Sequence, residues 1–296
     1  MIKTKEHIAV KAAYFSIFGN LALAILKGIT GYFGNSFALI ADAIESTGDV
    51  VSSTLVLAGL KYSSMPPDKN HPYGHGKAEP LVTFIVVGFL VAAAAIIGYQ
   101  SIVNIQTPHE LPEPYTLYIL GAIILTKEIF YRIVLSRSKQ TNSTSLKADA
   151  WHHRSDAITS LAAFIGISLA LILGKGYENA DDWAALTASF VILYNSFLIF
   201  RPALGEVMDE HLYDSLIEEI RKAALTVDGV LGTEKCLVRK AGMNYLVDLH
   251  IEVDSKESVK AGHSIAHRLK LSLMKEFPDI ANVLIHVEPY ESEMDE

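Results

Sequence analysis

The chain has 296 residues, of which 50% are hydrophobic and only 20% are charged, and its mean hydropathy of +0.28 is high for a soluble protein. A formal charge of −8 argues against nucleic-acid binding, because no large basic surface is available to neutralise phosphates. The single cysteine, Cys236, excludes an intramolecular disulfide and a Cys-x-x-Cys metal or redox site. Residues 1–208 carry 15 basic and 15 acidic side chains, whereas residues 209–296 carry 10 and 18. This division predicts two domains, 1–208 and 209–296, in different surroundings.

Six long apolar runs follow one another in the first domain. Each is close to the roughly 20 residues that a helix needs to cross the hydrocarbon core of a bilayer. The runs are 10–33, 37–60, 81–105, 115–134, 148–173 and 184–204. A soluble domain could contain one or two such segments, but six in succession predict an α-helical membrane protein with six transmembrane helices. The first run has no signal-peptide cleavage pattern, so we expect it to be retained.

Basic residues lie mainly in the N-terminal arm and in the joints after the second and fourth runs, whereas the alternate joints hold only Lys175. They include Lys3, Lys5, Lys11, Lys61, Lys69, Lys77, Arg132, Arg137, Lys139 and Lys147. Basic loops stay on the cytoplasmic side of a membrane. The sequence therefore predicts a multi-pass protein of the cell membrane with both termini in the cytoplasm.

In the second domain the apolar period changes. Segments 212–225 and 259–277 have the spacing of amphipathic helices, whereas 245–254 and 283–288 alternate as strands do, and 234–239 is a weaker strand prediction. The order helix, strand, strand, helix, strand predicts an α+β domain with both helices on one face of a small sheet. We expect this domain to lie in the cytosol, because its surface is acidic and its thiol reduced.

An internal repeat links the second and fifth runs. The pattern Ala-Asp-Ala-x-x-x-x-x-Asp occurs at 41–49 and again at 148–156. It predicts two related halves of three helices, an arrangement typical of transporters whose binding site lies where the halves meet. Asp42 and Asp149, which share the repeat, are expected to support the site or its access path. The alternative is a chance match between alanine-rich helices.

Four ionisable residues in these repeats form the predicted transport site. Glu45 and Asp49 are four residues apart, as are His152 and Asp156, so each pair shares a helix face. Ionisable side chains within a span normally face a water-lined cavity or a partner. Three carboxylates brought together beside one imidazole would repel one another without a counter-charge. A divalent cation supplies that charge, and one nitrogen with three oxygens suits tetrahedral coordination. The alternative is that they are merely solvated at the cytosolic mouth of the span.

The same ligand set suggests an energy source. A metal ion needs these groups deprotonated, so protons and metal would displace one another. The chain has no Gly-x-x-x-x-Gly-Lys-Ser/Thr loop and hence no standard means of using ATP. The sequence therefore predicts proton-driven secondary transport of a divalent transition metal rather than an enzyme, for zinc in the first place, with iron, cadmium, cobalt or manganese as alternatives. The rival hypotheses are an intramembrane metal-dependent hydrolase and a metal-sensing membrane receptor.

Two further clusters could bind metal. Asp68, His71 and His75 lie in the joint after the second run, where glycines allow a tight loop, although an ordinary polar turn is an equal alternative. In the second domain the candidates lie on the polar sides of predicted strands or on neighbouring elements. They are Glu234, His250, His263, His286 and Glu288, with His267 in reserve. Cys236 is expected to be a core residue rather than a ligand.

Charged residues also interrupt the first and fourth runs. Lys127, Glu128 and Arg132 fit the cytosolic half of the fourth run, where long side chains reach the interface. A role in lining the access cavity is the alternative. Lys27 in the first run is expected to extend outward.

With these residues laid out, the chain resembles the cation diffusion facilitator family over nearly its full length. The most specific features are the paired Ala-Asp-Ala-x-x-x-x-x-Asp helices and the loop His-Pro-Tyr-Gly-His-Gly-Lys-Ala-Glu-Pro at 71–80. The resemblance implies six spans, a C-terminal ferredoxin-like domain of the metallochaperone type, and a homodimer. It also implies the export of cytosolic divalent metal in exchange for protons.

The resemblance assigns roles by position. The transport site is then Glu45, Asp49, His152 and Asp156, the loop site is Asp68, His71 and His75, and the cytosolic sites use Glu234, His250, His263, His286 and Glu288. Lys77 and Asp209 match positions that join the two domains near the dimer axis. Two departures stand out. Glu45 occupies a position where Asp, His or Asn is more usual, and Glu234 and Glu288 replace an expected histidine and aspartate, which affects the preferred metal and the number of ions bound.

Overall fold

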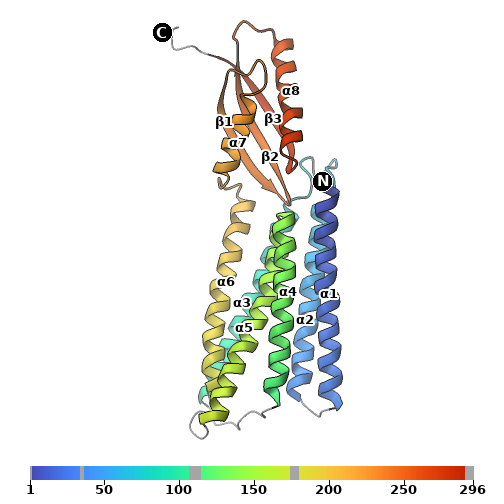
Figure 1. Ribbon diagram of the computed structural model, residues 1–296, viewed down its shortest axis with the longest axis vertical. Helices are drawn as coiled ribbons and strands as arrows, with labels where there is room; N and C mark the ends of the chain where they lie inside the picture. Colours follow the sequence, from blue (N-terminus) through green and yellow to red (C-terminus); the bar gives the residue numbers. More distant parts are fainter. Residues whose placement is uncertain (1, 34–36, 107–114, 174–179, 291–296) are drawn as a thin grey trace.

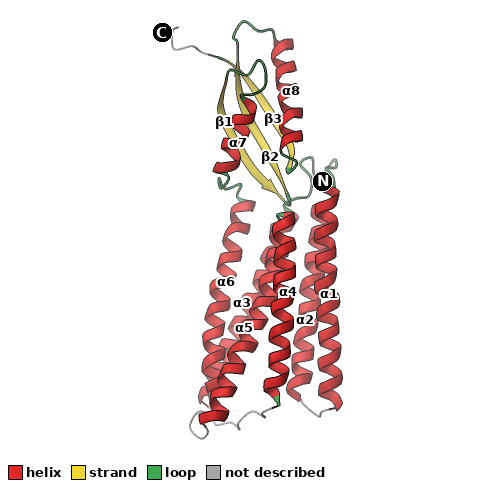
Figure 2. Ribbon diagram, viewed as in Figure 1, coloured by secondary structure: helices red, strands yellow, loops and turns green. Residues whose placement is uncertain are grey.

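The structure is a computed structural model that describes residues 2–33, 37–106, 115–173 and 180–290; the side chains of 2–4, 30–33, 37–45, 116, 170 and 181 lie outside this description. Within the described residues, long helices run side by side as an elongated bundle, and a small sheet with two helices covers one end of it (Figure 1). The change from all-helical to mixed structure occurs at this end (Figure 2). We call the mixed part, which begins after α6, the lobe.

The bundle contains one helix for each predicted apolar run. The helices are α1 (Ile2–Phe33), α2 (Phe37–Ser63), α3 (Ala78–Gln106), α4 (Thr116–Thr141), α5 (Thr144–Leu173) and α6 (Ala180–Val207). Among the described residues, α1, α3, α5 and α6 contain stretches that are long and apolar enough to cross a membrane. Helix α4 is less apolar because Lys127, Glu128 and Arg132 interrupt it. The side chains of α2 before residue 46 lie outside the description of the structure.

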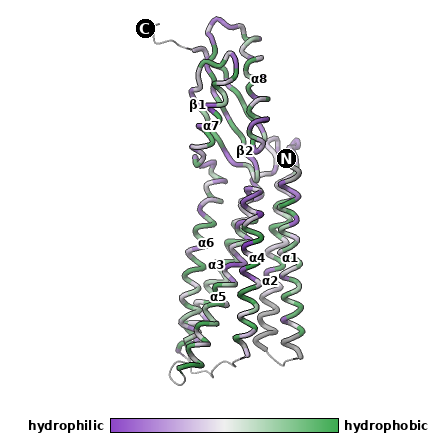
Figure 3. The backbone as a smooth tube through the Cα atoms, viewed as in Figure 1, coloured by the Kyte–Doolittle hydropathy of each residue, from purple (hydrophilic) through white to green (hydrophobic). Residues whose placement is uncertain are grey.

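The bundle is apolar outside and partly polar inside. Phe18, Ile172 and Phe190 are 64%, 80% and 64% exposed, whereas Lys127 and Asp149 are buried. Apolar colours predominate over the part of the bundle away from the lobe, whereas polar and apolar colours alternate within the lobe (Figure 3). This distribution is the reverse of that in a soluble bundle. It is expected for helices that contact lipid on their outer faces and carry a polar site within.

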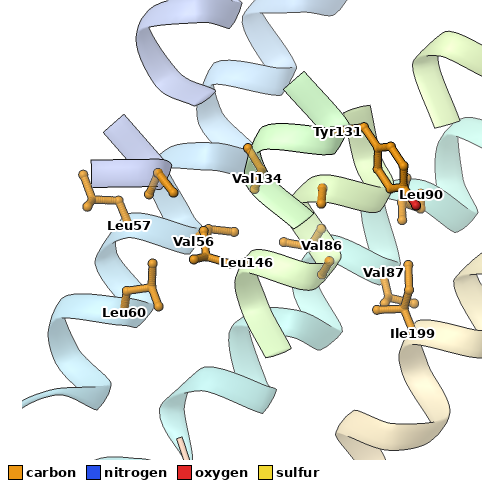
Figure 4. Packing of buried hydrophobic residues seen from close by; sticks show 14 of the residues in the cluster. Val56, Leu57, Leu60, Val86, Val87, Leu90, Tyr131, Val134, Leu146 and Ile199 are labelled. Atoms are coloured by element: carbon orange, nitrogen blue, oxygen red, sulfur yellow. The ribbon is translucent and has the colours of Figure 1, made fainter. Parts of the chain in front are cut away.

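Small and branched side chains hold the lobe end of the bundle together. Val56, Leu60, Val86, Val134 and Leu146 meet there between helices α2 to α5 (Figure 4). Helix α1 packs on α2, α4 on α5, and α3 on α6. The pairs α1–α2 and α4–α5 occupy equivalent places in the two predicted halves, although the duplication itself stays a prediction.

The lobe has the predicted order of elements. They are α7 (Asp214–Ala224), β1 (Gly232–Ala241), β2 (Asn244–Val253), α8 (Val259–Glu276) and β3 (Ile280–Pro289). The central strand β2 pairs antiparallel with β1 and parallel with β3. Ile220 of α7 and Leu269 of α8 pack in one core with Val247, Leu249 and Cys236. Both helices therefore cover the same face of the sheet, and the α+β fold prediction is confirmed.

The turn between β1 and β2 connects the lobe to the bundle. Met243 in this turn is 5% exposed and belongs to the bundle core. Beside it, Asn142 Nδ2 donates to Tyr245 Oη at 2.8 Å, and Lys5 Nζ pairs with Asp279 Oδ1 at 2.6 Å. The sequence did not predict this contact.

The basic joints lie at the lobe end of the bundle. The N-terminal end of α1 lies beside the lobe (Figure 1). The loop after α2 contacts the lobe where Gly76 meets Ala241, and Asn142 between α4 and α5 binds Tyr245. Since these three regions lie at the same end of the bundle as the lobe, a cytosolic lobe implies a cytosolic N-terminus.

Candidate metal-transport site

Helices α2 and α5 bring the predicted ligands together. Asp49, His152 and Asp156 each offer one ligand atom, and these atoms all lie within 4.8 Å of one another. His152 Nε2 is 2.9 Å from Asp49 Oδ1. The side chain of Glu45, the fourth predicted ligand, lies outside the described residues. One imidazole nitrogen and two carboxylate oxygens are donors that zinc and other divalent transition metals accept.

These ligands line a cavity of about 430 Å³ between the helices. The hydroxyl-bearing residues Ser52 and Thr159 also line it, and Phe89 and Ile192 contribute apolar surface. One water molecule takes up ~30 Å³ in the liquid, so the cavity has room for an ion together with water. The three described ligands therefore line a cavity between the helices.

Lys127 of α4 lies directly between the two aspartates. It is 1% exposed, and its ammonium donates to Asp49 Oδ2 and Asp156 Oδ2, both at 2.7 Å, and to Asn20 Oδ1 at 3.2 Å. The sequence allowed two interpretations of Lys127, a side chain that reaches the membrane interface or one that lines the access cavity. The structure shows that Lys127 lines the cavity. The packing of α4 against α5 and α1 explains the difference, because it turns Lys127 away from lipid.

The other charged residues that interrupt the first and fourth apolar runs differ in orientation. Glu128 and Arg132 form an outward-facing pair at 2.7 Å, with 31% and 76% of their side chains exposed. The expectation that Lys27 extends outward is wrong, because it is 7% exposed, lines the cavity and donates to Ser46 Oγ at 2.9 Å. A buried hydroxyl on α2 gives its ammonium a partner inside the bundle.

A buried hydrogen-bond network lies beside the site. Asp149 is fully buried and accepts hydrogen bonds from Ser16 Oγ at 2.7 Å and Ser53 Oγ at 2.9 Å. His153 Nε2 lies 3.1 Å from the same Ser16 Oγ. This network ties α5 to α1 and α2, so it fixes the helix that carries two of the ligands. Asp42, its counterpart in the repeat, lies outside the described side chains.

The loop after α2 also brings three ligands together. The donor atoms of Asp68, His71 and His75 lie within 4.8 Å of one another. Asp68 Oδ1 accepts the backbone N–H groups of His71 and Asn70 at 2.6 and 2.9 Å, and these bonds, chiefly that from His71, lower the pKa of the Asp68 carboxyl. Gly74, at φ +85°, allows the tight turn. The loop presents an ionised carboxylate to two imidazoles.

In the lobe, a cluster forms on the sheet face opposite the helices. His250 of β2 pairs in register with His286 of β3, and His250 Nδ1 lies 2.7 Å from Glu288 Oε1. His286 Nε2 is 3.5 Å from the same oxygen, and Glu234 Oε2 is 3.8 Å from His250 Nδ1. The neighbouring Glu288 carboxyl raises the pKa of Glu234. The pKa of Glu288 is lowered by the Glu234 carboxyl and by the hydrogen bond with His250.

His263 does not join this cluster within one chain. It is exposed on α8. Helix α8 covers the face of the sheet that contains Val247 and Leu249, whereas His250 points from the other face. The sheet therefore separates the two histidines. His263 lies beside His267, with ring centroids 6.5 Å apart.

The predicted junction residues lie where the bundle meets the lobe. Lys77 Nζ donates to the Asp209 carboxylate and to the carbonyl oxygen of Glu206. Arg239 Nη1 of β1 lies 3.9 Å from Asp209 Oδ2, and Lys240 Nζ lies 3.2 Å from Glu206 Oε2. These pairs link the loop after α2, the end of α6 and the first strand of the lobe.

Several contributing residues were missed in the sequence. Asn20 and Ser16 support the site or its neighbour Asp149, and Met243 joins the lobe to the bundle. Ser16 and Asn20 are four residues apart in an apolar run, so they share a helix face. That spacing was the available signal of a polar inner face on α1. Nothing in its own local sequence marks Met243.

Comparison with known proteins gives matches over both parts of the chain. Residues 13–208 match the family described as "Cation efflux transmembrane domain", and residues 212–290 match "Cation efflux protein, cytoplasmic domain". The chain is 34% identical to the manganese efflux system protein MneP of Bacillus subtilis, over 98% of this chain and 99% of that protein. It is 33% identical to metal tolerance protein 2 of Oryza sativa, over 90% of this chain and 75% of that protein. It is 30% identical to the cation-efflux pump FieF of Pectobacterium carotovorum, over 91% and 89%.

Proposed function

Because this chain belongs to the cation diffusion facilitator family, whose members are metal efflux transporters and not enzymes, we propose that it is a proton-coupled antiporter that exports a divalent transition metal, zinc in the first place. Family membership removes the hydrolase hypothesis. The proposed topology places both termini in the cytoplasm, with a transport domain at 1–208 and a cytosolic metal-binding domain at 209–296. The membrane is the cell membrane.

The observation that carries this proposal is the convergence of Asp49, His152 and Asp156 on one cavity between the helices. Their ligand atoms lie within 4.8 Å of one another although α2 and α5 are far apart in sequence. Buried carboxylates are costly in a bundle that faces lipid unless they have a partner. Glu45 is proposed as the fourth ligand from its place one turn before Asp49. A divalent ion bound here would be the transported substrate.

Proton coupling follows from the chemistry of these ligands. A metal ion binds the lone pairs of His152 Nε2 and of the aspartate oxygens, and protons bind the same lone pairs. Loading the site with metal therefore releases protons, and protonation from the opposite side releases metal. A proton gradient can drive export through this competition without another energy source.

The ligand atoms of the site narrow the choice of metal, but the order of preference among the remaining metals has to be measured. An imidazole ligand favours transition metals over magnesium and calcium. Zinc accepts a tetrahedral set of one nitrogen and three oxygens, whereas a carboxylate-rich site also suits manganese and iron. Manganese is the main rival to zinc here, because the relative MneP is named as a manganese efflux protein.

We assign the two remaining clusters to cytosolic metal. Asp68, His71 and His75 would form the loop site, and a second site would lie on the open face of the lobe sheet. The proposed lobe ligands are Glu234, His250, His286 and Glu288, whereas His263 joins no such cluster among the residues that the structure describes. Binding in the lobe would stabilise one arrangement of the transporter and so regulate flux.

A homodimer is the proposed assembly. The open face of the lobe sheet carries Leu237 and Leu284, which are 47% and 65% exposed and lie in one row through Asp248. Apolar side chains on an uncovered sheet face are suited to contact with a second copy. Lys77 and Asp209 would then couple the dimerised lobes to the transport helices.

The test is metal uptake into proteoliposomes. Zinc, manganese, cadmium, cobalt and iron are supplied one at a time, with and without a proton gradient, to the wild-type protein and to Asp49→Ala. Gradient-dependent uptake that is lost in Asp49→Ala supports the proposal. Glu128→Ala is the matched control, because this carboxylate is on the outer side of α4. Uptake that does not depend on the proton gradient, or that is retained in Asp49→Ala, would contradict the proposed function.

A further inference from the structure

The ammonium of Lys127 occupies the point where the two transport-site aspartates converge. Its three N–H bonds are matched by three oxygens, Asp49 Oδ2 and Asp156 Oδ2 at 2.7 Å and Asn20 Oδ1 at 3.2 Å. A lysine ammonium has three donors and no acceptor, so its hydrogen-bonding capacity is fully used. These bonds join α4 to α1, α2 and α5.

A divalent ion would need the same oxygens. Zinc binds carboxylate oxygen at about 2.0–2.2 Å, closer than the lysine approaches it. The metal would then lie within a few ångströms of a positive charge in a buried site, where water screens repulsion poorly. Lys127 and a metal ion therefore cannot both occupy the convergence point of Asp49 and Asp156.

The surroundings allow the lysine to withdraw. Lys127 and both aspartates line the same cavity, so the ammonium has space beside it. Asn20 on α1 is a neutral acceptor that the ammonium already touches. Ser52 also lines the cavity, and its buried hydroxyl has no hydrogen-bond partner among the described residues. A flexible four-carbon side chain reaches such neighbouring acceptors by rotation about its own bonds.

We propose that Lys127 is a tethered counter-cation of the transport site: it neutralises the aspartates when they hold neither metal nor protons, and it is displaced when metal binds. This inference rests on the proposed function, because it concerns the same site. The lysine keeps its charge throughout and changes only its position. It is a positioning residue that sets metal affinity by competition.

Two consequences follow for transport. Competition with an internal cation weakens metal binding and speeds metal release, so the lysine lowers affinity and favours turnover. It also favours ions that form a bond to His152 Nε2, because such a bond offsets the loss of the lysine contacts. Calcium and magnesium, which prefer oxygen ligands, gain least from that nitrogen.

The experiment compares Lys127→Gln and Lys127→Met with Lys127→Arg, which keeps the charge. The probes are zinc and manganese, each alone. Binding is titrated on the detergent-purified full-length protein, and KM and kcat are measured in proteoliposomes. We expect both neutral variants to bind metal at least about tenfold more tightly, with lower KM and lower kcat, and Lys127→Arg to stay closer to wild type. The matched control is Lys240→Met, which removes another buried, paired lysine outside the cavity.

A second readout covers the possibility that the neutral variants are unstable. Without the lysine, the metal-free site holds unpaired carboxylates, so added metal should raise the melting temperature more than it does in wild type. An unchanged or weaker metal affinity in Lys127→Gln, with an unchanged thermal response, would overturn the inference. If the wild-type protein itself takes up no metal, the proposed function fails instead, and the two failures are distinguishable.

Discussion

His152 Nε2 lies 2.9 Å from Asp49 Oδ1, although the two residues are 103 positions apart and lie on different helices, α5 and α2. The contact exists only because α2 and α5 pack together, so the metal ligands are assembled by the fold rather than by a local motif. A metal ion entering here would replace a contact between α2 and α5. Loading of the site and the relative position of α2 and α5 are therefore linked.

Replacing His152 with aspartate should change metal preference. The variant removes the only described imidazole nitrogen of the site and leaves oxygen ligands. Since nitrogen favours zinc and oxygen suits manganese, we expect the zinc-to-manganese ratio of initial uptake rates to fall at least about tenfold. Competitive uptake of the two ions in proteoliposomes measures this ratio. His211→Asp, at an exposed histidine of the connection between α6 and α7, is the control; an unchanged ratio in His152→Asp would exclude the imidazole as a ligand.

Loss of the loop histidines should remove one bound ion without stopping transport. His71→Ala with His75→Ala leaves Asp68 alone, and one carboxylate does not hold a transition metal at micromolar concentration. We expect the number of ions bound per chain to fall by one, with proton-driven uptake retained. Equilibrium dialysis with metal analysis gives the count. A normal count would favour the polar-turn interpretation of this loop.

The pH dependence of the loop site should not come from Asp68. The backbone N–H of His71 lowers the pKa of this carboxyl, so its ionised form is retained below the usual range. The contribution of the carboxylate to the loop is present above its unfolded pKa and is lost only as pH falls through the lower folded value. Between about pH 7 and pH 5, Asp68→Asn should weaken metal binding by a constant factor. A factor that shrinks over this interval would show that Asp68 titrates there.

The lobe cluster should control stimulation rather than basal flux. His250→Ala with His286→Ala removes both imidazoles of the cluster but leaves the bundle untouched. We expect metal-dependent stimulation of uptake to disappear while the unstimulated rate stays the same. Rates at increasing cytosolic-side metal concentration measure it. His267→Ala, on the opposite side of the sheet, is the comparison; equal loss of stimulation in that variant would place the regulatory site elsewhere.

The sequence predicted most of the fold, because hydrophobic period and length are local properties. Alternation over 245–254 located β2, and the repeated pattern singled out Asp49 and Asp156, which lie on α2 and α5. The direction in which Lys127 points could not be predicted, since it depends on how α4 packs. The insertion of Met243 into the bundle likewise depends on the docking of two domains. His263 could not be separated from His250 without knowing which sheet face α8 covers.

Cys236 should be almost unreactive in the folded protein. Burial in the lobe core raises the pKa of its thiol to about 11, so little thiolate forms at neutral pH. Because the unfolded thiol ionises at lower pH, its contribution to stability is present below the unfolded pKa and is lost as pH rises through the folded value. We expect slow labelling by a thiol reagent at pH 8 and fast labelling in denaturant. Fast native labelling would mean that the lobe core opens readily.

Gly76→Ala should weaken the contact between the loop after α2 and the lobe. A Cβ atom at Gly76 would lie 2.5 Å from the carbonyl carbon of Ala241 and 2.9 Å from the backbone nitrogen of Gly242, so the backbone must shift. Overpacking of this kind typically costs about 1–3 kcal/mol. We expect a lower melting temperature in detergent and faster proteolysis of the loop. Gly88→Ala is the matched control, because a Cβ there meets nothing within 4 Å and alanine favours a helix. If the two variants melt alike, the turn between β1 and β2 does not stabilise the junction.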